Sequence, residues 1–184
     1  MPIVPDTKDW TWVLERRCDE CGFEAAVVPK EQVAALIRGN ATSWQPILLG
    51  PAPLTVRPSD DCWSALEYAC HVRDVCRLYD GRLRLMLTED DPTFPNWDQD
   101  AAAVEGRYNE QDPTRVAEEL GTAALALAAS FDAVRGEQWE RTGRRSDGAS
   151  FTVDTFARYL VHDPVHHLHD VEFGLAALEP RAGP

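Results

Sequence analysis

The sequence lacks the features that mark membrane, secreted and nucleic-acid-binding proteins. No stretch approaches the roughly 20 consecutive apolar residues that a membrane-spanning helix requires. The first ten residues, MPIVPDTKDW, do not combine a basic start with an apolar run. Positive charge is scarce, because 18 Lys and Arg stand against 31 Asp and Glu and leave a formal net charge of −13. Because such a surface repels phosphate groups, we expect a cytoplasmic protein that binds neither membranes nor nucleic acids.

Cysteine is also sparse, and its five residues are an odd count. Cys62, Cys70 and Cys76 fall within one expected helix, which is unlike the disulfide framework of a small secreted protein. Cys18 and Cys21 form C-x-x-C-G, which has the spacing of half a zinc knuckle. The other cysteines do not supply a second pair at that spacing. We therefore expect a turn with two reduced thiols in preference to a metal or redox centre.

The residues that are present indicate one helical domain. A chain of 184 residues with 44% hydrophobic and 9% aromatic residues can bury a core of its own. Proline and glycine divide it into four segments with the apolar spacing of amphipathic helices, at 29–49, 62–88, 112–136 and 150–178. A long connection with a short helical turn at 101–107 joins the second segment to the third. We predict an all-α four-helix bundle with one long crossover connection.

The first 28 residues fit this pattern less well. The segment DWTWVLERRC alternates weakly between apolar and polar residues, as a strand does, and the two cysteines follow it. We therefore divide the chain into a short irregular N-terminal extension at 1–28, which carries C-x-x-C, and a bundle domain at 29–184.

All five histidines lie in two of the four helical segments. His71 belongs to the second segment, and the other four belong to the last one. At about 100° per residue, His162, His166 and His169 fall within a sector of about 60° on one helix face. His167 points roughly 100° away from His166. We expect the face with three histidines to point inward.

Aromatic residues bracket this histidine face. Tyr159 precedes it and Phe173 follows it in the same helical phase, so that both rings are expected to line a pocket together with Trp63. Pro164 interrupts the segment between two histidines and removes one backbone hydrogen bond. Because the phase continues across the proline, we expect a kinked but continuous helix. The alternative is a new helix that begins with Asp163 as its cap.

The second helical segment carries polar residues on an otherwise apolar stripe. Glu67, His71 and Asp74 are spaced four and three residues apart there. Burying several ionisable groups costs several kcal/mol unless they are paired or bind a metal. Two histidines one helical turn apart can share an ion with a third from a neighbouring helix. We therefore predict a divalent metal site at His71, His162 and His166, with a metal-free histidine–carboxylate cluster as the alternative.

Three protein ligands leave a coordination position open to water or substrate, which is typical of catalytic sites. Glu67, Asp74 and His169 are the candidates for proton transfer or for orienting the ligands. Their alternative role is pairing with the imidazoles or with nearby arginines. Asp163 and Asp170 are interpreted as solvated or hydrogen-bonded helix residues.

Two segments of the chain resemble a known family. The residues WSALEYACHVRDV at 63–75 and YLVHDPVHHLHDV at 159–171 are similar to the DinB-like superfamily of metal-binding four-helix bundles, which includes mycothiol-dependent maleylpyruvate isomerases and bacillithiol S-transferases. The resemblance covers about 150 residues. It implies a divalent ion, with zinc favoured over nickel or iron, bound by His71, His162 and His166. The chain departs from the family pattern at Pro164, His167 and His169.

Two functions follow from these observations. The first is an enzyme whose three-histidine metal site activates a low-molecular-weight thiol or water for transfer to, or isomerisation of, a small electrophilic substrate. The alternative is a non-catalytic, metal-stabilised bundle that binds a small molecule or a protein partner, with a homodimer formed through the alanine-rich segment at 112–136. A di-iron carboxylate bundle is disfavoured because the paired Glu-x-x-His motifs that it requires are missing. An H-E-x-x-H metalloprotease is excluded because the sequence lacks that motif.

Overall fold

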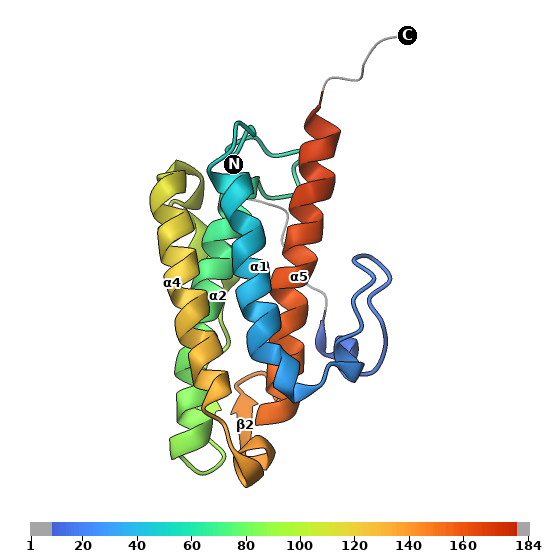
Figure 1. The fold of residues 1–184 in the computed structure, drawn as a ribbon, viewed down its shortest axis with the longest axis vertical. Coiled ribbons are helices and arrows are strands. Elements are labelled where there is room, and N and C mark those ends of the chain that lie inside the picture. The colour runs from blue at the N-terminus through green and yellow to red at the C-terminus, as the bar shows by residue number, and fades with distance from the viewer. Residues whose placement is uncertain (1–8, 180–184) are drawn as a thin grey trace.

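The structure, a computed structural model, describes residues 9–179 and confirms the predicted four-helix bundle (Figure 1). A short helix in the crossover and five 3-10 turns complete the helical elements of this range. The helices are α1 (Val33–Leu48), α2 (Ala65–Thr88), α3 (Gln99–Glu105), α4 (Pro113–Asp132) and α5 (Val153–Leu178). The 3-10 turns are η1 (Thr11–Leu14), η2 (Ala25–Val27), η3 (Lys30–Gln32), η4 (Tyr108–Glu110) and η5 (Gly136–Glu140).

Three of the long helices begin at polar caps. At α2 the Ser64 hydroxyl accepts a hydrogen bond from the Glu67 backbone N–H at 3.3 Å, and the Glu67 carboxylate accepts one from the Ser64 N–H at 2.9 Å. Asp112 caps α4, and Pro113 occupies its first position, as the sequence predicts. Thr152 caps α5. These side chains satisfy backbone N–H groups that the first turn of a helix leaves unpaired.

In the bundle, α1 lies diagonally opposite α2, and α4 lies diagonally opposite α5. α4 and α5 each pack against both α1 and α2, on opposite sides of them. The colours of Figure 1 show that the crossover returns the chain to the end where α2 begins, so that α2 and α4 run in one direction and α1 and α5 in the other. This arrangement places α2 beside α5, which carry all five histidines. The largest fully buried core side chains include Trp44, Leu66, Leu83, Leu120, Leu127, Phe156 and Leu160.

A small three-stranded sheet, which the sequence does not predict, lies at one end of the bundle. β1 (Thr93–Phe94) pairs in parallel with β2 (Thr142–Arg145), which pairs in antiparallel fashion with β3 (Ser150–Thr152). A side chain at Gly143 would place its Cβ 2.7 Å from Met86 Cγ. Glycine therefore allows β2 to pack directly against the end of α2.

The N-terminal extension packs along α5 instead of forming a strand. The segment expected to alternate as a strand contains the turn η1, and both η1 and η2 contact α5. Val13 is buried there, and the Arg158 guanidinium of α5 donates a hydrogen bond to the Ala26 carbonyl at 2.6 Å. Figure 1 shows this segment, in blue, beside α5.

Helix α5 continues through Pro164, as predicted. The Pro164 carbonyl accepts a hydrogen bond from Asn40 Nδ2 of α1 at 2.7 Å, and Asn40 Oδ1 accepts one from Trp44 Nε1 at 3.0 Å. This buried polar contact fixes α1 against α5 at the level of the histidines.

Two of the expectations from the sequence concern the first residues of the chain and membrane-spanning helices. The opening residues 1–8 lie outside the described range. Within residues 9–179, no helix is both long enough and apolar enough to cross a membrane.

Candidate metal centre

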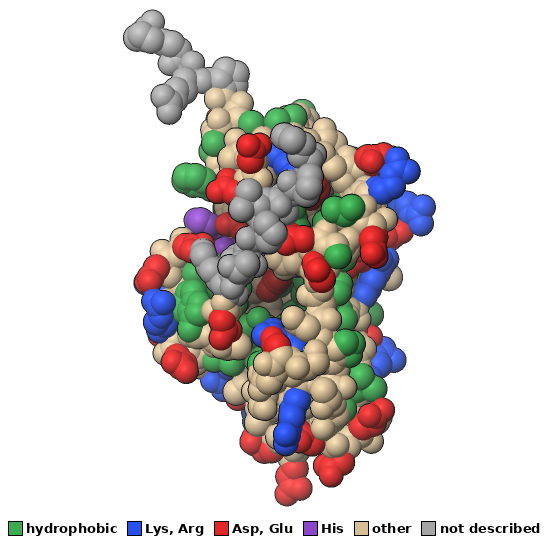
Figure 2. Space-filling view, turned by 180° about the vertical axis from the view of Figure 1, so that it is seen from behind, with side chains coloured by type: hydrophobic (Ala, Val, Ile, Leu, Met, Phe, Trp, Pro, Cys, Tyr) green, Lys and Arg blue, Asp and Glu red, His purple; other side chains and the backbone are tan. Residues whose placement is uncertain are grey.

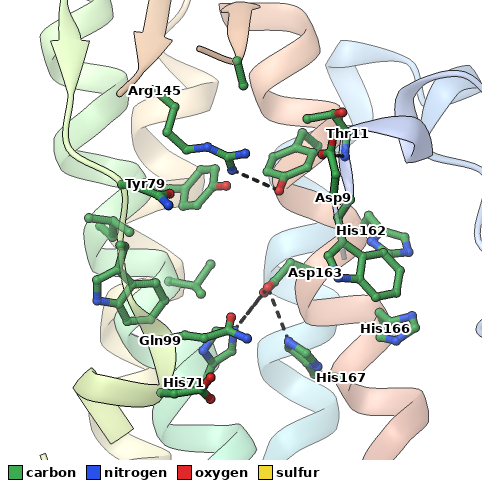
Figure 3. A pocket seen from close by; sticks show the side chains of 18 of the residues that line it. Asp9, Thr11, His71, Tyr79, Gln99, Arg145, His162, Asp163, His166 and His167 are labelled. Atoms are coloured by element: carbon green, nitrogen blue, oxygen red, sulfur yellow. Dashed lines mark hydrogen bonds and ion pairs between the residues drawn. The ribbon is translucent and has the colours of Figure 1, made fainter. Parts of the chain in front are cut away.

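A cavity of about 1190 Å³ lies between α2, α5, the crossover and the N-terminal extension. Figure 2 shows the face of the molecule opposite to that of Figure 1. Acidic side chains are spread over this face, and histidine atoms reach the surface among them. Figure 3 shows the interior of the cavity, with His71 on one wall and the histidines of α5 on the other. Its lining includes Trp63, His71, Trp97, Arg145, Asp163 and His167.

His71, Asp163 and His167 form the first of two groups of metal-ligand atoms, which we call the cavity triad. Their ligand atoms all lie within 4.8 Å of one another. His71 Nε2 lies 3.2 and 3.3 Å from the two Asp163 carboxylate oxygens, and His167 Nε2 lies 3.5 Å from Asp163 Oδ2. In Figure 3 the two imidazoles approach the carboxylate from different sides. Two facing helices therefore direct three donors at one point.

The charges of the cavity triad depend on one another. Burial lowers the pKa of His71, although the Asp163 carboxylate opposes this shift. Burial also disfavours a charge on His167, but Asp163 and Asp170 outweigh it and raise the pKa of His167 to about 9. Both imidazoles in turn hold the pKa of Asp163 below its usual range despite its burial. The carboxylate thus requires a positive charge beside it, which either a proton on His167 or a cation can provide.

The cavity triad fits a divalent cation. Two imidazoles and a carboxylate are ligands that zinc, nickel and iron accept. A hydrogen bond between His167 Nδ1 and Asp170 Oδ2, at 3.1 Å, leaves Nε2 directed at Asp163. Burial keeps His71 neutral, which is the form that binds a metal. Its Nδ1 is buried without a hydrogen-bond partner among the described residues.

Cys18, Cys21, His162 and His166 form the second group, which we call the cysteine–histidine cluster. Their ligand atoms also lie within 4.8 Å of one another. Cys18 Sγ is 3.7 Å from His166 Nδ1, and Cys21 Sγ is 3.7 Å from His162 Nε2. All five cysteines of the chain are free thiols, in agreement with the sequence. The extension therefore supplies two sulfur atoms to the same helix that supplies part of the cavity triad.

The structure divides the three histidines that the sequence places at one ion. His71 belongs to the cavity triad, whereas His162 and His166 belong to the cysteine–histidine cluster. Adjacent residues of a helix point about 100° apart. The pair at 162 and 166 therefore faces the extension, while Asp163 and His167, one position further along, face α2.

Asp163, His167 and the two cysteines are the members that the sequence interpretation does not assign to a metal. Asp163 is hydrogen-bonded, which is one of the two roles that the sequence interpretation gives it, and its carboxylate lies between two imidazoles. Its spacing from His167 equals that of the two histidines chosen, so spacing alone does not distinguish the pairs. The sequence pattern that could have identified the cysteines as metal ligands is C-x-x-C combined with H-x-x-x-H. Two histidines can complete a zinc knuckle just as two further cysteines can.

Two of the candidate catalytic residues have structural contacts away from the triad. Glu67 completes the cap of α2 and accepts hydrogen bonds from Arg57 Nε and Nη2 at 2.9 and 2.5 Å. Asp74 accepts hydrogen bonds from the Arg73 guanidinium at 2.9 Å and from the Tyr108 hydroxyl at 2.6 Å. Neither residue lines the cavity described above. Asp74 thus shows the arginine pairing that the sequence offers as its alternative.

His169 and the aromatic residues differ in their exposure. The side chain of His169 is 42% exposed, and its Nδ1 lies 3.8 Å from Asp170 Oδ1. Trp63 is buried with its ring centroid 5.2 Å from that of His71, whereas Phe173 is 75% exposed and borders the cavity at its rim. Trp97 from the crossover stacks on His71 at 5.3 Å, a contact that sequence patterns do not reveal.

Comparison with known proteins supports the interpretation of the fold. A family model described as the DinB superfamily matches residues 47–171. No curated protein matches the chain. Among solved structures, the chain is similar to YfiT from Bacillus subtilis, which is described as a probable metal-dependent hydrolase with an unusual four-helix bundle topology. The TM-score is 0.69 and the identity 18%, over 78% of this chain and 84% of that chain, which shows a shared fold. Because the family match spans more than half of its residues, this chain belongs to the DinB superfamily.

Proposed function

We propose that this protein is a metal-dependent enzyme whose divalent ion is held by His71, Asp163 and His167. The observation that carries the proposal is the convergence of these three donors, from α2 and α5, on one point in the wall of a large cavity. Catalytic metal sites combine three protein ligands with an open position in this way. In this assignment the ligand pair on α5 moves by one residue from the pair chosen on sequence grounds.

The surrounding residues orient the ligands. An ion held by these residues would act as a Lewis acid and would lower the pKa of a water molecule or of a thiol. The hydrogen bond to Asp170 fixes the ring of His167, and such outer contacts also raise the basicity of a ligand. The rings of Trp63 and Trp97 pack against His71 and limit the access of bulk water to it.

The cavity suits a small polar substrate. Its volume of about 1190 Å³ slightly exceeds the roughly 300–1,000 Å³ of most small-molecule sites, so a small substrate fits within it. Arg145 lies on the wall opposite the cavity triad in Figure 3, where its guanidinium donates hydrogen bonds to Asp147 at 2.7 Å and to the Tyr159 hydroxyl at 3.3 Å. We propose that a small electrophile binds between Arg145 and the cavity triad, and that the attacking group is water or a low-molecular-weight thiol. The description of YfiT as a hydrolase favours water, and the thiol follows from the family resemblance.

Metal analysis of purified variants tests the site. We expect His71→Ala and His167→Ala each to remove one equivalent of divalent ion relative to the wild type. His169→Ala is the matched control, because this histidine lies on the same helix but in neither ligand group, and it should retain the full metal content. If both ligand variants kept the wild-type stoichiometry, the cavity triad would not be the metal site.

The nucleophile is tested with the metal-loaded full-length protein. Esters, amides and electrophilic alkenes would be supplied with and without a thiol, and the products identified by mass spectrometry. Hydrolysis products that form without thiol indicate water, and thiol adducts indicate transfer. Either activity should fall by at least about 100-fold in His71→Ala, because a metal site contributes several kcal/mol to the transition state. Metal binding without turnover of any substrate would support the non-catalytic alternative.

A further inference from the structure

We propose that the cysteine–histidine cluster is a second metal site, a closed zinc site that fastens the N-terminal extension to α5. It uses different atoms from the cavity triad and does not depend on the proposed enzymatic function. Its ligands come from two segments that are more than 100 residues apart in the chain, which the fold brings into contact. The zinc knuckle that the sequence provides only in part is completed by two histidines of α5.

The distances match tetrahedral zinc. With Zn–S near 2.3 Å and Zn–N near 2.1 Å, a sulfur and a nitrogen on one ion are separated by about 3.6 Å. Two of the four sulfur–nitrogen pairs, Cys18 with His166 and Cys21 with His162, are separated by 3.7 Å, and all four ligand atoms lie within 4.8 Å of one another. Zinc sites of this class use C-x₂₋₄-C with H-x₃₋₅-H, and Cys18, Cys21, His162 and His166 meet both spacings.

The local backbone presents both sulfur atoms on one side. The Cys18 N–H donates to the Phe23 carbonyl and the Gly22 N–H donates to the Cys18 carbonyl, each at 2.9 Å, which closes a tight turn around the pair. Gly22 has a φ of 74°, a left-handed conformation that favours glycine. This backbone conformation explains why a glycine follows the second cysteine in C-x-x-C-G.

A carboxylate lies behind one of the imidazoles. His166 directs Nδ1 at Cys18 Sγ, while its Nε2 lies 3.4 Å from Glu20 Oε2 and 3.6 Å from Asp170 Oδ1. Metal-bound histidines usually donate their second N–H to such a group, which fixes the tautomer and strengthens the ligand. Glu20, one of the two acidic residues between the cysteines, thus has a place in the site as well.

Charge and burial favour four ligands with no open position. Cys18 is 1% exposed, His162 and His166 are 4% and 6% exposed, and Cys21 is half-buried. Two thiolates and a Zn²⁺ ion sum to zero charge, which suits a buried site better than free thiolates or an unpaired cation. The ring of Trp10 covers both imidazoles, with centroids 5.5 Å from His162 and 4.9 Å from His166. Closed sites of this kind stabilise structure.

Cobalt substitution of the full-length protein tests the site directly. A thiolate bound to Co²⁺ gives a near-ultraviolet charge-transfer absorption that histidine and carboxylate ligands do not give. We expect this band in the wild type and in the double variant His71→Ala/His167→Ala, and its loss together with one equivalent of ion in Cys18→Ser/Cys21→Ser. Cys62→Ser is the control, because this half-buried thiol lies in neither ligand group, and it should keep the band. A wild type that binds cobalt without the band would overturn the proposal.

Thiol labelling of the wild type gives an answer that does not depend on how the variants fold. Alkylation followed by peptide mass spectrometry would compare zinc-loaded protein with chelator-treated protein. We expect Cys18 and Cys21 to be labelled at least about tenfold faster after chelation, while Cys62 reacts at the same rate in both. Hydrogen exchange of residues 9–28 should accelerate in parallel. Equal labelling with and without chelator, or a disulfide between Cys18 and Cys21 in the purified protein, would contradict a zinc site.

Discussion

His162 and Asp163 are adjacent in the chain, yet they contact different partners on different sides of α5. His162 Nε2 lies beside Cys21 of the extension, whereas Asp163 lies between His71 and His167. The difference arises from the rotation of about 100° between neighbouring residues of a helix. One short helical segment can therefore serve two metal sites whose ligands differ in softness and in coordination.

The pairing of Glu67 with Arg57 predicts a pH-dependent contribution to stability. Burial alone would raise the pKa of Glu67, but the hydrogen bonds from Arg57 and from the Ser64 N–H lower it below its ordinary value of 4.5. The ionised carboxylate therefore stabilises the folded state above that pH, and this contribution is lost as the pH falls through the lowered pKa. We expect Glu67→Gln to reduce the free energy of unfolding by about 1–3 kcal/mol at neutral pH.

Urea unfolding of the wild type and the variant, at neutral pH and again below 4.5, checks this prediction. The difference between the two proteins should shrink at the lower pH. Glu118→Gln is the control, since Glu118 lies on an exposed part of α4 and its replacement should change stability little. A difference that stayed constant across this pH range would show that the charge of Glu67 is not involved.

At the scale of elements, the small sheet determines how one end of the cavity is built. β2 carries Arg145 toward the cavity, and it can approach α2 because Gly143 leaves room for Met86. The basic segment RTGRR at 141–145 therefore includes a residue of the cavity wall. A two-residue strand such as β1 is too short to produce a periodic pattern in the sequence.

Substitution of Gly143 tests this packing. Because the new Cβ would lie 2.7 Å from Met86 Cγ and 3.1 Å from Phe94 Cε1, we expect Gly143→Ala to destabilise the protein by about 1–3 kcal/mol. Gly39→Ala is a control of opposite sign, because a Cβ added at that exposed helical glycine would meet nothing within 4 Å, and alanine favours a helix by about 0.5–1 kcal/mol. Denaturant midpoints would separate the two. A neutral Gly143→Ala would mean that Met86 moves aside without cost.

At the scale of the whole molecule, the net charge of −13 attracts divalent cations and repels anions. Acidic side chains surround the exposed histidine atoms in Figure 2. An anionic substrate would therefore approach against the overall field and would depend on local basic residues such as Arg145. A cation would be drawn toward both ligand groups.

Salt should slow metal uptake for this reason. The association rate constant of Co²⁺ with metal-free protein, measured by stopped-flow absorption, should fall about tenfold between low and physiological ionic strength. The dissociation rate should change much less, because screening acts mainly on the approach of the ion. If the association rate did not depend on salt, the acidic surface would have no part in metal capture.

The sequence predicts the fold of this protein better than its sites. Apolar spacing, proline and capping residues mark all four long helices, and phase continuity correctly predicts that α5 passes through Pro164. The extension and the sheet escape prediction, because turns and two- to four-residue strands are held by contacts with distant segments. The grouping of the metal-ligand residues is not predictable from the sequence for a related reason. Which residue pair of H-D-x-x-H-H faces α2 depends on the rotation of α5, which packing determines.

The interleaving of ligands on α5 limits how this segment can change. Substitution of a single residue can alter one set of donors and leave the other in place. Within the six residues 162–167, insertion or deletion of a residue between positions 163 and 166 would instead turn one member of each pair away from the other, and both proposed metal sites would be lost together. The length of these six residues is therefore constrained more tightly than their individual identities.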